Sequence, residues 1–105
     1  MFEKFIPEPF LSALTRNINI NQINEIRFRA MKPVIVYLFG QAYFLSENGI
    51  TTDIKQALVA QKEVLDEIVF RASECSIYAV NEQIKKGFLT VAGGIRIGIG
   101  GTDVF

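Results

Sequence analysis

The chain has 105 residues, half of them apolar, and 11 Lys and Arg balance 11 Asp and Glu to give a formal net charge of zero. This length fits a single domain with its own core, and the apolar content argues against a disordered chain. The balanced charge disfavours nucleic acid as a partner, because nucleic-acid binding usually needs a basic excess or a basic face.

Histidine is absent and Cys75 is the only cysteine. Histidine-based catalytic pairs, histidine metal clusters and an intrachain disulfide are therefore excluded. The first ten residues hold no apolar run long enough for a signal peptide, and the longest apolar run, 34–39, is far too short to span a membrane. We expect a soluble, cytosolic protein.

Apolar residues at helical spacing predict a short helix over residues 8–16, with Pro7 and Pro9 early enough for a first turn. The apolar face of this Phe-rich helix is strong enough to dock on a sheet or on a partner. The segment that follows at 24–30 places Ile26 and Phe28 in alternation with charged residues. This period of two predicts a half-buried strand.

The β-rich run VIVYLF at 34–39 predicts a central strand covered on both faces. A tight turn at Gly40-Gln41 leads into a further strand, and a second turn lies at 47–49. These elements predict a three-stranded meander over 24–45. The next segment, 50–60, is ambiguous between strand and helix, and we favour an extended conformation.

Two helices are predicted in the second half of the chain. A stripe of apolar residues predicts an amphipathic helix from Gln61 to about Ser73. Residues 76–87 predict another, with Ser76 as a possible N-cap and Gly87 at its end.

The glycine-rich stretch at 91–101 predicts a β-hairpin rather than a phosphate-binding loop. Phe88 to Ala92 makes one strand, Gly93-Gly94 supplies the positive φ angles of the turn, and isoleucines alternate on the return strand. Neither the Walker A pattern G-x-x-x-x-G-K-[ST] nor the dinucleotide pattern G-x-G-x-x-G is met. The positions that share the other face of the return strand are Arg96, Gly98 and Gly100.

Three arginines are candidate binding residues, and no catalytic constellation or metal-ligand cluster is recognisable. Arg96, on a face otherwise occupied by glycine, can reach an anion or a partner, or it merely covers the sheet and pairs with a glutamate. Arg27 and Arg29 either share such a role or form a solvated strand face. Pattern alone leaves both interpretations open.

Two stretches carry a family resemblance: INEIRFRAMKPV at 23–34 and ASECSIYAVNEQIKKGFLTVAGGIRIGIGG at 72–101. Together they resemble the N-terminal region of the stage III sporulation protein AA family of endospore-forming bacteria. The first is similar to that family's EIR-x-R-x-x-x-P strand and turn, and the second to its long Y-A/S…G-F-x-T-x-x-G-G-x-R-x-G block. Family members often have His after the paired glycines, where Ile95 stands here, so no role of that histidine carries over.

The resemblance implies a secretion-type ATPase, related to type II and type IV secretion motors, in which an N-terminal module precedes a RecA-like motor carrying Walker A and B. Residues 1–105 would be the single N-terminal domain, with the motor beyond them. ATP and Mg²⁺ are implied for the full-length protein, and none for this fragment. The implied partners are its own motor domain, further copies in a hexameric ring and other stage III channel proteins, and the implied location is the mother-cell cytoplasmic face, peripheral to the outer forespore membrane.

The resemblance also ranks the candidate residues. Arg96 matches the arginine after the glycine pair and is the first candidate for a nucleotide or inter-subunit contact. Arg27 and Arg29 match the EIR-x-R arginines and come next. The glycines of the hairpin, which allow close approach, are Gly93, Gly94, Gly98 and Gly100.

We therefore predict an α+β, sandwich-like fold with a mixed or mainly antiparallel sheet backed by helices, PAS-like as in pilus motors. The predicted function is that of a structural and regulatory domain of a sporulation ATPase. The alternative is a free-standing PAS-like module that binds a ligand or a protein without ATPase activity. A third interpretation is an assembly domain whose oligomers are driven by the Phe-rich N-terminal helix or by an open final strand.

Overall fold

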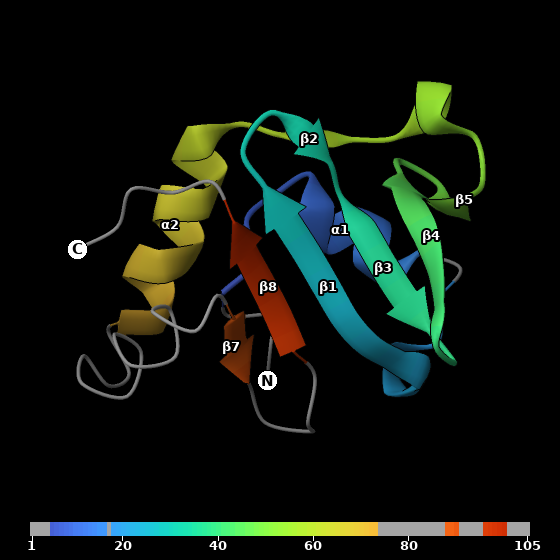
Figure 1. Cartoon of the computed structure of the whole chain (residues 1–105), viewed down its shortest axis with the longest axis horizontal. Coiled ribbons are helices and arrows are strands. Elements are labelled where there is room, and N and C mark those ends of the chain that lie inside the picture. The colour runs from blue at the N-terminus through green and yellow to red at the C-terminus, as the bar shows by residue number, and fades with distance from the viewer. Residues whose placement is uncertain (1–4, 17, 74–87, 91–95, 101–105) are drawn as a thin grey trace.

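The centre of the protein is a six-stranded mixed sheet (Figure 1). The structure is a computed structural model, and it describes residues 5–16, 18–73, 88–90 and 96–100. Two α-helices are described, α1 (Phe10–Thr15) and α2 (Lys62–Ser73), together with the 3₁₀ turns η2 (Ile20–Gln22) and η3 (Ile54–Gln56). The described strands are β1 (Ile23–Arg29), β2 (Lys32–Pro33), β3 (Ile35–Leu38), β4 (Gln41–Ser46), β5 (Gly49–Thr51), β6 (Val59–Ala60), β7 (Phe88–Thr90) and β8 (Arg96–Gly100).

The strand order in the main sheet is β5-β4-β3-β1-β8-β7. Neighbouring strands are antiparallel except for β1 and β8, which pair in parallel. A parallel pair requires a long crossover connection, and α2 lies within the connection that returns the chain from the meander to β8. The short strands β2 and β6 form a separate two-stranded sheet. The predicted α+β class with a mixed sheet is confirmed, whereas the PAS-like shape remains a prediction.

The predicted meander is confirmed, with β1, β3 and β4 joined in that order and β5 added as a fourth antiparallel strand. The turn between β3 and β4 consists of Phe39 and Gly40, one residue earlier than expected. Their φ angles are +51° and +79°. Positive φ at both central residues is the signature of a type I′ hairpin turn, whose twist matches that of the flanking strands.

Strand β3 is buried on one face only, which corrects the expectation of a strand covered on both. Val36 and Leu38 are buried, while Ile35 and Tyr37 are half-buried. The reason is that the buried side chains of both helices join one core on a single face of the sheet. In Figure 1, α1 lies behind the strands and leaves their front face without a helix among the described elements.

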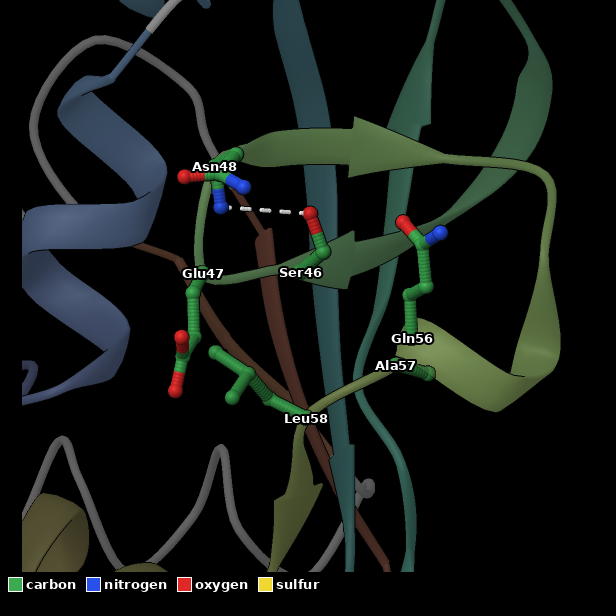
Figure 2. Close-up of a pocket in the computed structure, with 6 residues that line it drawn as sticks. All are labelled: Ser46, Glu47, Asn48, Gln56, Ala57 and Leu58. Carbon is green, nitrogen blue, oxygen red and sulfur yellow. Dashed lines mark hydrogen bonds between the residues drawn. The ribbon is translucent and has the colours of Figure 1, made fainter.

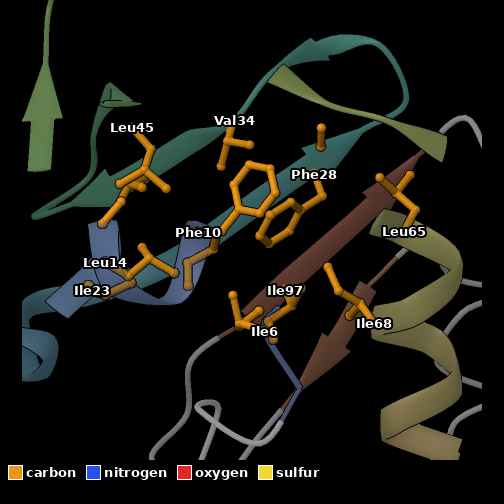
Figure 3. Packing of buried hydrophobic residues seen from close by; sticks show 14 of the residues in the cluster. Ile6, Phe10, Leu14, Ile23, Phe28, Val34, Leu45, Leu65, Ile68 and Ile97 are labelled. Carbon is orange, nitrogen blue, oxygen red and sulfur yellow. The ribbon is translucent and has the colours of Figure 1, made fainter. Parts of the chain in front are cut away.

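The core is one continuous apolar cluster that joins α1, α2 and the sheet (Figure 3). At its middle the rings of Phe10 and Phe28 meet edge to face, with centroids 5.7 Å apart and planes at 84°. Phe10 is 3% exposed, so the apolar face of the N-terminal helix is used inside the domain. The buried members of the cluster are Ile6, Phe10, Ala13, Leu14, Ile23, Ile26, Phe28, Val34, Val36, Leu38, Leu45, Ala60, Leu65, Ile68, Val69 and Ile97.

Most of the remaining sequence expectations are confirmed. Helix α2 matches the predicted 61–73, and the segment 50–60 is extended except for the turn η3. The predicted helix over 76–87 lies outside the described residues, as does the Gly93-Gly94 turn. The strands on either side of that turn pair antiparallel as predicted.

The assembly alternative stays a prediction, and the described residues bear on both of the surfaces that it proposed. The N-terminal helix buries its phenylalanine in the core, as described above. The final described strand, β8, lies between β1 and β7 and is no open edge; the edge strands of the main sheet are β5 and β7.

Candidate functional site

The parallel pairing of β1 with β8 places the candidate arginines and glycines on neighbouring strands. The register aligns Glu25 with Arg96, Arg27 with Gly98, and Arg29 with Gly100. Residues about 70 positions apart in the sequence thereby come together. We call these six positions the arginine face. Gly93 and Gly94 lie outside the described residues.

Strand alternation sets which side of the sheet this face occupies. Ile26 and Phe28 are fully buried in the core, so the positions between and beside them lie on the opposite side. Ile97 of β8 is likewise fully buried, which puts its neighbours 96 and 98 on the same side as 25 and 27. The arginine face is therefore the side of the sheet without a described helix.

Arg27 is held by two neighbours on this face. Its Nε and Nη2 both donate to Oε2 of Glu25, at 3.0 and 2.8 Å. Its guanidinium carbon lies 5.0 Å from the ring centroid of Tyr37, the cross-strand partner of Glu25. Stacking on an aromatic ring and pairing with a carboxylate both fix the planar guanidinium. Arg27 is 40% exposed and Glu25 17%, so the pair is accessible but not fully solvated.

Arg29 differs from Arg27. It is exposed and makes no hydrogen bond or ion pair within the part of the chain that the structure describes. Among the described residues its charge is therefore not shared with a carboxylate. Arg96 is placed by its backbone, directly beside Glu25. By residue type, the six positions of the arginine face hold three arginines, one glutamate and two glycines, although the whole chain is neutral.

Sequence reasoning identified the arginines but missed Glu25 and Tyr37. The spacing of Glu25 and Arg27, two residues apart in a strand, was a usable signal, because such residues share a face. Tyr37 could not be found in this way, since its position beside Arg27 depends on the register between β1 and β3.

Apolar side chains extend the arginine face across the meander. Arg27 is paired with Ile35, and Ile35 with Phe44, so the three form one row over β1, β3 and β4. Ile35, Tyr37 and Phe44 are all half-buried. Aromatic side chains beside arginine are typical of protein-binding surfaces.

A separate hollow of about 380 Å³ lies at the end of β4 (Figure 2). Sequence analysis found no motif in this region. Leu58 and Ala57 supply its apolar part, and Ser46 is tied into the β4–β5 turn by donating to the Gly49 carbonyl at 2.8 Å. The residues that line it are Ser46, Glu47, Asn48, Gln56, Ala57 and Leu58.

Two further observations concern the described residues alone. They contain no group of three or more Cys, Asp or Glu side chains that could hold a metal ion. Within the same segments, no helix is long and apolar enough to cross a membrane.

The fold and the arginine face define an α+β domain with one helix-covered and one arginine-bearing side of its sheet. The family model described as "Sporulation stage III, protein AA" matches residues 11–105, and the chain belongs to this family. It is 34% identical over 80 residues to stage III sporulation protein AA of Bacillus subtilis (strain 168), a match that covers 76% of this chain and 22% of that protein. The chain thus matches about a fifth of the length of its curated relative. No solved structure matches it significantly.

Proposed function

We propose that this chain is the N-terminal structural and regulatory domain of a secretion-type sporulation ATPase that energises the channel between mother cell and forespore. The observation that carries the proposal is the membership of the stage III sporulation protein AA family. The relative is several times longer than the matched region, which leaves room for a motor domain in a longer protein. ATP and Mg²⁺ would bind to that motor.

In this proposal the arginine face is the surface that meets the motor domain or a neighbouring subunit. A guanidinium can neutralise charge on a phosphoryl group or pair with a carboxylate in two-pronged fashion. Arg96 is the first candidate because it matches the family's arginine after the glycine pair. Arg29 comes before Arg27, because Arg27 already shares its charge with Glu25. The glycines beside Arg27 and Arg29 add no side chain to that face.

The proposed partners are the protein's own motor domain, further copies in a hexameric ring and other stage III channel proteins. The proposed location is the cytoplasmic side of the mother cell, peripheral to the outer forespore membrane. These assignments rest on the family and on no contact within the described residues.

The first test is to read the gene beyond codon 105 and to assay the full-length protein for ATP hydrolysis. A Walker A motif followed by Walker B supports the proposal, and a stop codon at position 106 overturns it. Arg96→Ala and Arg29→Ala are then expected to lower ATP turnover or ring assembly. Arg71→Ala is the matched control, because Arg71 lies on α2 and pairs with Glu67 at 2.7 Å. Unchanged turnover and assembly in both test variants would exclude the arginine contact while leaving the ATPase assignment standing.

A further inference from the structure

The turn between β4 and β5 contains the pair Asn48-Gly49, the one place in the sequence where glycine follows asparagine. This order of residues permits a reaction within the chain itself. The backbone nitrogen of the second residue can attack the side-chain carbonyl carbon of the asparagine. Glycine favours the attack, because it has no side chain to obstruct the approach and a wide range of backbone angles. Asparagine is accordingly counted among the thermolabile residues.

The fold presents this pair at the surface and at the edge of the sheet. Glu47 and Asn48 are the two exposed residues of the turn, and Gly49 follows with a φ of +115°. Strand β5, which begins at Gly49, has three residues and is an edge strand of the described sheet. Turns and short edge elements open at a lower free-energy cost than the core of a domain. Asn48 is therefore exposed to water and lies beside a part of the sheet that opens readily.

Ser46 holds the turn closed. It is 6% exposed, and its hydroxyl accepts from the Asn48 backbone amide at 3.2 Å (Figure 2) and donates to the Gly49 carbonyl at 2.8 Å. The end of α1 adds a further bond, because Nη1 of Arg16 donates to the Glu47 carbonyl at 3.3 Å. Attack on the Asn48 side chain requires the backbone of both residues of the pair to rotate. These hydrogen bonds must therefore open before the reaction can proceed.

We propose that Asn48 is a site of spontaneous deamidation and that the β4–β5 hairpin controls its rate. The Gly49 nitrogen gives up its proton to hydroxide and forms a bond to Cγ of Asn48, the bond from Cγ to Nδ2 breaks, and ammonia leaves with the proton that it takes from water. Water then adds to either carbonyl of the resulting five-membered imide ring and opens it. The products are aspartate and isoaspartate at position 48, and one molecule of water is consumed for each ammonia released.

Both products change the turn. Each places a new carboxylate next to Glu47 and takes the formal net charge of the chain from zero to minus one, and adjacent like charges repel. Isoaspartate also adds one carbon to the main chain of a loop whose length sets the register of the hairpin. We expect this product to loosen the pairing of Ser46 with Gly49 and hence β5. The change is slow and one-way, and it requires no motor domain and no partner.

The test is to incubate the purified 105-residue chain in mildly alkaline buffer and to follow position 48 by peptide mass spectrometry and ion exchange. We expect the mass gain of an amide converted to an acid at Asn48 and far less at Asn24, an internal control that precedes Glu25. The chain unfolded in guanidinium should react at least about tenfold faster at Asn48, because no hairpin has to open. Asn48→Gln, which would have to form a larger ring, should abolish the mass gain at this position.

Two variants test the control by the hairpin. Ser46→Ala removes both hydroxyl bonds and should speed the reaction about tenfold, and Arg16→Ala, at an exposed position, should speed it about threefold. Arg71→Ala, on α2, should leave the rate unchanged, and melting curves show whether each variant is folded. The proposal is overturned if the folded original chain gains no more mass at Asn48 than at Asn24, if it reacts as fast folded as unfolded, or if the folded variants of the hairpin react at the original rate.

Discussion

Glu25 and Arg27 lie two residues apart on the same face of β1, and a single carboxylate oxygen of Glu25 accepts from both Nε and Nη2 of Arg27. The same guanidinium lies over the ring of Tyr37 on the adjacent strand. This contact holds Arg27 in a fixed arrangement beside Glu25, whereas Arg29 forms no ion pair with any of the described residues. The two arginines of β1 therefore differ in their surroundings although they share a face.

Arg27→Ala is expected to lower the free energy of unfolding by about 1 kcal/mol. An ion pair with an exposed member contributes about 0.2–1 kcal/mol, and the stack on Tyr37 about 0.5–1 kcal/mol. Arg27→Lys should recover part of the loss, because it keeps the charge without the planar fork. Urea denaturation at low and high salt separates the contribution of the Glu25 ion pair from that of the Tyr37 contact, because salt weakens the ion pair more. A loss as small as that of Arg71→Ala, which removes an exposed helix pair, would show that Arg27 contributes nothing beyond an ordinary surface charge.

Phe28→Ala is expected to lower the free energy of unfolding by about 3–5 kcal/mol, the range found for deleting a buried aromatic ring. Phe28 is fully buried and meets Phe10 edge to face, so its loss opens a cavity between α1 and the sheet. The free energy of unfolding of a domain of this kind is only about 5–15 kcal/mol. Thermal melting is therefore measured on Phe28→Leu, which removes less of the buried side chain and keeps the chain folded. A double-mutant cycle with Phe10→Leu should give a coupling of about 1 kcal/mol. Additive effects would contradict the ring contact.

The hairpin tip allows a paired prediction of opposite signs. Phe39→Asn should raise stability by about 1 kcal/mol, because Asn tolerates the left-handed conformation of this position. Gly40→Ala should lower it by about as much: Gly40 has a φ of +79°, and a Cβ there would touch nothing within 4 Å, so the cost is purely conformational. Each change corresponds to roughly 4–8 °C in melting temperature for a domain of about this size. A Phe39→Asn chain that melts below the original would show that the phenylalanine stabilises the turn.

The sequence predicted those elements whose cause is local. Alternation in 24–30 and the apolar stripe of 61–73 are direct consequences of strand and helix geometry, and β1 and α2 appear where expected. The burial of β3 on one face could not be predicted, because it depends on both helices packing against the same side of the sheet. The β3–β4 turn lies one residue earlier than the sequence predicts, because the glycine pattern favours Gly40 as its first residue whereas Phe39 takes that position in the type I′ turn.

The candidate site, too, was predicted only in its local features. The sequence pattern identified the arginines as candidates, but it did not predict that they lie on neighbouring strands. That arrangement requires β8 to lie between β1 and β7 and in parallel with β1. A glycine-rich hairpin has no sequence signal for the strand that it will join. The hollow at Leu58 could not be predicted from the sequence either, because its walls come from two separate segments, the β4–β5 turn and η3.

The parallel register can be tested with an engineered cross-link. Glu25→Cys with Arg96→Cys, in a Cys75→Ala background, puts two thiols at directly paired positions of β1 and β8, a spacing suited to a disulfide. Oxidation should give an efficient link, and closing a loop of about 70 residues should raise the free energy of unfolding by up to about 4 kcal/mol. The control Asn24→Cys with Arg96→Cys should link poorly, because strand alternation puts positions 24 and 25 on opposite sides. Equal linking of the two pairs would mean that the register is wrong, and Arg96 would then have to be removed from the arginine face.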